Sequence, residues 1–212
     1  MLRLRNVEQA LANFFASGLL LLGPKLGPIL WQFSPNFSFN ASLLESFFQL
    51  LPQSTNEAAQ LGRRHDSRVD GRSYTDTDED RALRHAIEIR HDSFLSEDFI
   101  RLLRRYQIAL VCADTVSWPR LVDATADFVY CRLHGSRELY DSGYGPKAIV
   151  TRADRMAPWA TGNSVSGPRV TPFSPTEARP HDVYVYFDND MKVRAPSDAL
   201  ALERRLCRLG FA

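Results

Sequence analysis

The sequence predicts an α/β fold with a parallel sheet, and two observations predict it. Short apolar runs bounded by glycine, proline or polar residues alternate along the chain with segments of helical periodicity, which is typical of parallel sheets covered by helices. In residues 126–135, one parity is apolar throughout, whereas the other begins with Phe128 and Tyr130 and ends with Arg132 and His134. A strand that is apolar at its base and charged at its tip suits a barrel or an open α/β sheet, where sites form at the carboxyl ends of the strands.

The order of the predicted elements follows from these patterns. Strands are predicted at residues 27–33, 86–90, 108–114, 128–135 and 182–189, and helices at residues 10–22, 42–51, 96–106, 151–160 and 196–209. Asn6 with Gln9, and Ser42 with Glu45, have the spacing of pairs that begin helices. Residues 161–180, rich in glycine, proline, serine and threonine, predict an irregular connector.

Residues 61–84 break the alternation. This segment is dense in charges of both signs and poor in apolar side chains, so its burial would not offset the entropy of ordering it. We predict a flexible charged insertion there.

Length, charge and cysteine usage limit the classes of protein to which the chain can belong. The chain has 212 residues, 44% of them hydrophobic, and a formal net charge of +1. We therefore expect a single domain over residues 1–212 and no nucleic-acid partner. The apolar N-terminal run is interrupted by polar residues and is too short to span a membrane, so no membrane partner is expected either. The three cysteines include no C-x-x-C pair, which indicates core thiols in a reducing compartment and predicts a cytoplasmic protein.

Polar side chains gather at the carboxyl ends of the predicted strands. If the parity of Arg132 and His134 is followed along the other strands, the residues expected to converge with them are Gln32, Glu88, Arg90, Asp114, Tyr186 and Asp188. On the strand at residues 108–114, this places Ile108, Leu110 and Cys112 on the same face as Asp114. The alternative is structural, because buried carboxylates must pair with arginines in any case.

This convergence predicts a site for a small, anionic metabolite, although the sequence does not decide whether the protein is an enzyme. The catalytic candidates are His134 to move a proton and Glu88 or Asp114 to orient it. The candidate ligand-binding residues are Gln32, Arg90, Arg132, Tyr140, Tyr144, Tyr186, Asp188 and Asn189, with Arg90 and Arg132 expected to hold the anion.

Two other functions stay open. One is a metal-dependent phosphodiesterase or isomerase with ligands among Glu88, Asp114, His134 and Asp188, although these are scattered singly and no metal site is assigned. The other is a non-catalytic scaffold that binds partners through residues 61–84 or 161–180. No cofactor is identified, because the chain contains no dinucleotide, Walker or zinc-protease motif.

Five motifs, in this order, resemble those of the DUF72 (YecE-like) family. They are KLGPILWQF at 25–33, AIEIRHDSF at 86–94, ADT at 113–115, TADFVYCRLHG at 125–135 and DVYVYFDND at 182–190. The resemblance implies a TIM-type barrel of uncharacterised function. Family members carry three further strand–helix units before the first motif, so these strands resemble the fourth to the eighth of eight. Without the resemblance, the alternation alone favours an open five-stranded doubly wound sheet.

An incomplete barrel has a physical consequence. Closure pairs the last strand with the first, so with strands four to eight alone, residues 27–33 and 182–189 would be sheet edges rich in apolar side chains. We therefore expect that residues 1–212 are a truncated or mis-started product, or need a partner that supplies the missing strands, and are inactive alone.

Overall fold

The computed structural model describes residues 4–115, 118–135, 143–173, 177–189 and 193–211. They form two compact units, one of Met1–Leu30 with Asn40–His85 and the other of Trp31–Phe39 with Ala86–Ala212. The chain crosses between the units within the strands β1 (Ile29–Gln32) and β2 (His85–Glu88), and also between Phe39 and Asn40. Among the described helices, none combines the length and the apolar character that crossing a membrane requires.

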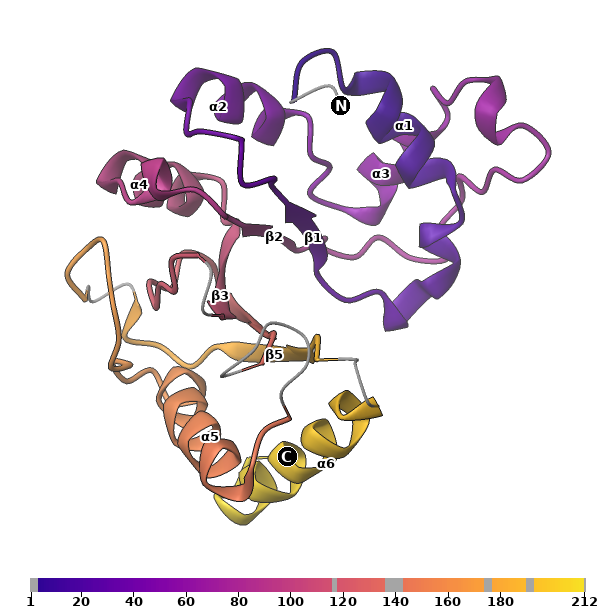
Figure 1. Ribbon diagram of the computed structural model, residues 1–212. Helices are drawn as coiled ribbons and strands as arrows, with labels where there is room; N and C mark the ends of the chain where they lie inside the picture. Colours follow the sequence, from indigo (N-terminus) through magenta and orange to yellow (C-terminus); the bar gives the residue numbers. More distant parts are fainter. Residues whose placement is uncertain (1–3, 116–117, 136–142, 174–176, 190–192, 212) are drawn as a thin grey trace. The chain divides into compact units, whose positions relative to one another are not determined.

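The first unit is helical. It contains α1 (Glu8–Ala16), α2 (Ala41–Gln49) and α3 (Thr55–Gly62), together with the 3₁₀ helices η1 (Leu19–Lys25) and η2 (Ser67–Val69). Helix α1 packs against α3 (Figure 1). The large, fully buried side chains of this unit include Phe15, Leu44 and Phe48, so its core is built by the apolar faces of the helices.

Both predicted helix-start pairs are wrong. The residue before α1 is Val7, which makes no side-chain cap, and Asn6 has a φ of 50°. Helix α2 is capped by Asn40, whose side chain accepts a hydrogen bond from the backbone N–H of Leu43 at 2.9 Å. An asparagine with extended backbone satisfies a free N–H of the first turn as well as a serine does, so the helix begins before Ser42.

The charged segment 61–84 is joined to the rest of the first unit by backbone hydrogen bonds. The N–H of Tyr74 donates to the carbonyl of Ala16 at 2.7 Å, and the N–H of Leu83 donates to that of Gln53 at 2.9 Å. Its flexibility stays a prediction.

The sheet has five strands in the order β1-β2-β3-β4-β5, where β3 is Ala109–Asp114, β4 is Phe128–Leu133 and β5 is Asp182–Phe187. Successive strands pair in parallel. The five predicted strands are confirmed. The doubly wound alternative is wrong, because the strand order of such sheets reverses at a switch point, whereas here each strand lies beside the next one in sequence.

Two helices of the second unit cover β4 and β5. Helices α5 (Pro146–Ala160) and α6 (Ala195–Arg208) lie side by side (Figure 1). Val129, Cys131 and Leu133 of β4 share one buried cluster with residues of both helices, which confirms the apolar parity predicted for this strand. Helix α5 begins at Pro146, before the predicted start, because proline is well tolerated in the first turn.

The unit also contains α4 (Glu97–Arg105), preceded by the 3₁₀ helix η3 (Asp92–Phe94). Here the core is aromatic. Phe94 lies 4.9 Å from Phe99 and 5.9 Å from Phe33, measured between ring centroids.

The register of β3 against β4 corrects one predicted face. Cys112 pairs with Cys131, Ala113 with Arg132 and Asp114 with Leu133. Paired residues on neighbouring strands point to the same side of a sheet. Asp114 and Cys112 therefore lie on the face covered by α5, and Arg132 lies on the opposite face. The expectation that Asp114 shares a face with Arg132 is wrong.

A pair of glycine variants tests the packing after α5. Gly162 has a φ of +75°, and a Cβ there would lie 2.7 Å from the carbonyl carbon of Arg179. Gly71 has a similar φ of +72°, and a Cβ there meets nothing within 4 Å. Each alanine variant carries about 1–2 kcal/mol of left-handed backbone strain, and Gly162→Ala adds a backbone clash. We expect urea denaturation to show a clearly larger loss of stability for Gly162→Ala, and equal losses would contradict the packing.

Candidate functional site

Six of the predicted site residues form one ion-pair network, composed of Gln32, Glu88, Arg90, Arg132, His134 and Asp188. Its centre is Arg132, which donates to the carboxylates of Glu88 and Asp188 and, at 2.7 Å, to the amide oxygen of Gln32. Arg90 Nε donates to Glu88 Oε1 at 2.9 Å. Two guanidinium groups thus face two carboxylates, and the network is neutral when His134 is neutral.

Glu88 is the most strongly bound carboxylate of the network, and its side chain is 0% exposed. Burial alone would raise its pKa, but a hydrogen bond with His134 and the charge of Arg132 outweigh burial and lower the pKa of Glu88 to about 2. Glu88 is therefore ionised at neutral pH.

His134 lies between the two carboxylates. Its Nδ1 is 3.0 Å from Asp188 Oδ2 and its Nε2 is 3.7 Å from Glu88 Oε2. The ring also contacts Trp118 edge to face, at 5.3 Å between centroids, and the guanidinium of Arg90 lies 4.2 Å from the Trp118 ring centroid. Trp118 is thus held by two members of the network.

A second group, the Asp114 cluster, lies on the helix-covered face. Its members are Asp114, Arg120, Tyr144, Arg152 and Arg155. Arg152 Nε donates to Asp114 Oδ2 at 2.7 Å, and Arg120 and the Tyr144 hydroxyl approach the same carboxylate at 3.2 Å. Burial and the charge of Asp114 raise the pKa of Tyr144, so its hydroxyl stays a hydrogen-bond donor.

Arg155 gives this cluster an excess of positive charge. Burial, together with the charges of Arg120 and Arg152, lowers the pKa of Arg155. No hydrogen bond or ion pair joins its guanidinium to any residue in the described part of the chain. Three guanidinium groups therefore surround the single carboxylate of Asp114.

A cleft of about 750 Å³ opens beside this cluster. The charged residues that line it are Asp92, Asp114, Arg120 and Arg152, and Trp118 and Gly135 line it as well. A smaller cavity of about 30 Å³ shares Asp114, Arg120 and Arg152 with the cleft and extends to Cys112, Cys131 and Arg155. The cleft therefore combines polar groups from α5 and the loop after β3 with the indole that rests on the ion-pair network.

Three further predicted site residues, Tyr144, Asn189 and Tyr186, make other contacts. Tyr144 belongs to the Asp114 cluster, and Asn189 donates from its side-chain amide to Asp198 at 2.8 Å. Tyr186 stacks on Tyr130 at 4.8 Å between ring centroids. Tyr140 lies outside the described residues.

Sequence reasoning missed Trp118, Arg120, Arg152 and Arg155. Arg152 and Arg155 are three residues apart in a helix and so share a face, a signal that was available once a helix was predicted there. Trp118 and Arg120 lie outside any helix or strand, so no periodicity marks them.

Comparisons with known proteins identify the family. The family described as "Protein of unknown function DUF72" matches residues 1–210. The chain belongs to the DUF72 family. This confirms the resemblance of the five motifs, and the description assigns DUF72 proteins no activity. Among curated proteins, none matches the chain.

Solved DUF72 structures share the fold. A DUF72 family protein from Thermotoga maritima is 21% identical with a TM-score of 0.58, over 86% of this chain and 58% of that one. A DUF72 family protein from Enterococcus faecalis is 17% identical with a TM-score of 0.56, over 86% of this chain and 59% of that one. The chain thus spans less than two thirds of the length of these relatives.

The ion-pair network predicts an acid-dependent loss of stability. The pKa of Glu88 lies below its ordinary 4.5, so Glu88 stabilises the fold above that value and the contribution is lost as the pH falls towards 2, on the order of 3 kcal/mol. Glu88→Gln should therefore lower the free energy of unfolding by about this amount at pH 7, with a smaller difference near pH 3. The measurement is urea denaturation between pH 3 and pH 7.

Glu97→Gln is the matched control, because the side chain of Glu97 is 66% exposed. It should change stability by only a few tenths of a kcal/mol. A Glu88→Gln protein that keeps the pH dependence of the unchanged chain would contradict the assignment.

Proposed function

We propose that this DUF72 protein binds a small anionic molecule in the cleft at the carboxyl ends of β3 and β4. The observation that carries the proposal is the excess of positive charge beside the cleft, where Arg120, Arg152 and Arg155 outnumber the two carboxylates of Asp92 and Asp114. A bound anion would relieve the mutual repulsion of the guanidinium groups. The cleft volume of about 750 Å³ falls in the range of small-molecule sites, roughly 300–1,000 Å³.

Arg120 is the best candidate to contact the anion. Its side chain is 31% exposed, it lines the cleft, and its contact with Asp114 is a single 3.2 Å hydrogen bond. Guanidinium carries five N–H donors, and within the described residues only this one bond of Arg120 is found, which leaves donors for a ligand. Arg120 thus takes the role that the sequence suggested for Arg90 and Arg132, whose donors are directed at Glu88, Asp188 and Gln32.

The ion-pair network supports the cleft wall in this proposal. Trp118 lines the cleft, whereas its neighbours Arg90 and His134 do not. Neither His134 nor Glu88 lines the cleft. Asp114 does, but its carboxylate is already bound by Arg120, Tyr144 and Arg152, so we propose binding and no reaction. Arg132 already neutralises Glu88 and Asp188, which disfavours the alternative of a metal held by these carboxylates.

We also propose that the five strands are the fourth to eighth of a TIM-type barrel. The pairing of each strand with the next one in sequence supports this arrangement. Sites of such barrels lie at the carboxyl ends of the strands, where this cleft is found.

The test measures stabilisation by inorganic phosphate and by citrate, with sodium chloride at equal ionic strength as the reference. At a ligand concentration ten times the Kd, binding stabilises by about 1.4 kcal/mol, which raises the Tm of a chain of this size by about 3–5 °C. Arg120→Met should raise the Kd of the anion by about tenfold to a hundredfold, because a charge-assisted hydrogen bond contributes about 1.5–3 kcal/mol.

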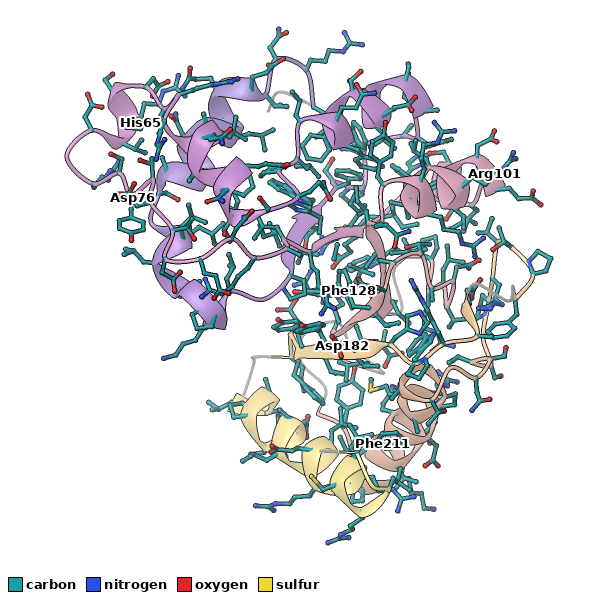
Figure 2. All side chains as sticks on the ribbon, turned by 180° about the vertical axis from the view of Figure 1, so that it is seen from behind. His65, Asp76, Arg101, Phe128, Asp182 and Phe211 are labelled. Carbon is teal, nitrogen blue, oxygen red and sulfur yellow. The ribbon has the colours of Figure 1, made fainter. Side chains whose placement is uncertain are left out.

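Arg101→Met is the control. Arg101 lies on the outer side of α4 (Figure 2), and its side chain is 68% exposed. It should leave the anion-induced shift unchanged. Equal shifts in both variants, or equal shifts with chloride, would contradict the proposed site.

A further inference from the structure

Cys112 and Cys131 form a pair of neighbouring thiols that the proposed function does not use. They are direct register partners on β3 and β4 and point to the same face of the sheet. Neighbouring strands lie about 4.8 Å apart, and disulfides join Cα atoms about 4.4–6.8 Å apart. The backbone therefore already places both cysteines within reach of a disulfide, although both are free thiols here.

The surroundings of the two thiols make them unequal. A hydrogen bond from Cys131 and the charges of Arg120 and Arg155 lower the pKa of Cys112, whereas burial and the charge of Asp114 oppose this without reversing it. The same hydrogen bond and burial raise the pKa of Cys131. Cys112 is therefore the thiol more readily ionised, and Cys131 is the neighbouring proton donor. The thiolate is the reactive form of a cysteine.

The two thiols also lie next to the cleft. Both cysteines line the cavity of about 30 Å³, and Asp114, Arg120 and Arg152 line this cavity and the larger cleft alike. Cys112 is half-buried, whereas Cys131 is buried. Of the two thiols, Cys112 is therefore the more accessible to a molecule the size of hydrogen peroxide.

We propose that Cys112 and Cys131 are a peroxide-reactive dithiol that closes to an intramolecular disulfide. The Cys112 thiolate attacks one peroxide oxygen, the O–O bond breaks, and the sulfur becomes a sulfenic acid while the other oxygen leaves as an alcohol or water. The Cys131 thiol then attacks the Cys112 sulfur, the S–O bond breaks and a second water leaves. Two electrons pass from the two thiols to the peroxide. This proposal does not rest on anion binding.

The experiment uses the full chain in a Cys207→Ser background, because Cys207 is exposed and would react by itself. After treatment with hydrogen peroxide, the folded protein should lose both remaining free thiols and two hydrogen atoms of mass. The tryptic peptides 106–120 and 121–132 should be joined, and dithiothreitol should restore both thiols.

Single-cysteine variants separate the two roles. With Cys131→Ser, Cys112 should stop at a sulfenic acid that dimedone traps. With Cys112→Ser, Cys131 should keep its free thiol under the same treatment. Retention of both thiols in the folded protein, oxidation of Cys112 beyond the sulfenic acid with no disulfide, or a disulfide that forms only in guanidinium would each overturn the proposal. The phosphate measurements are unaffected by these outcomes, so the two proposals fail independently.

Discussion

The pairing register of β3 and β4 decides which polar groups meet in the second unit. Ala113 lies beside Arg132, and Asp114 lies beside Leu133. Since side chains alternate between the faces of a sheet, this register directs Arg132 and His134 to one face and Asp114 and Cys131 to the other. A slip by one residue would exchange every side chain of β3 between the faces. Asp114 would then join the network, and the arginines of α5 would lose their carboxylate.

The two faces differ in how their charges are balanced. On one face, Arg90 and Arg132 are matched by Glu88 and Asp188, and the buried carboxylate of Glu88 makes removal of a partner costly. Such a network rigidifies the strand ends. On the other face, Arg155 has a positive charge that Asp114 cannot neutralise alone. The balanced group therefore suits a structural role and the unbalanced group suits ligand binding.

The sequence predicts the strands and the network better than the cleft, for reasons of burial. On β4, Val129, Cys131 and Leu133 are apolar, whereas Arg132 on the alternate positions is charged. The two faces of β4 can therefore be told apart from the sequence. On β3 both parities are apolar, and nearly every residue is buried. The alternation of polar and apolar residues then does not show which face each side chain occupies. This is why the predicted face of Asp114 is wrong. Trp118 and Arg120 are positioned by tertiary contacts with Arg90 and Asp114, for which a single sequence carries no periodic signal.

The proposed anion site and the proposed dithiol share the same positively charged neighbours. Arg120 favours both an anion in the cleft and the Cys112 thiolate, and Arg155 adds to the field around both. A thiolate and a bound anion repel one another and compete for these guanidinium groups. Formation of the disulfide removes the thiolate, so the anion no longer competes with it for the guanidinium groups. Linkage is reciprocal, so a bound anion would in turn disfavour the Cys112 thiolate and slow its reaction with peroxide. If both proposals hold, the geometry of β3 and β4 would couple the redox state of the thiols to occupancy of the cleft through the charges that they share.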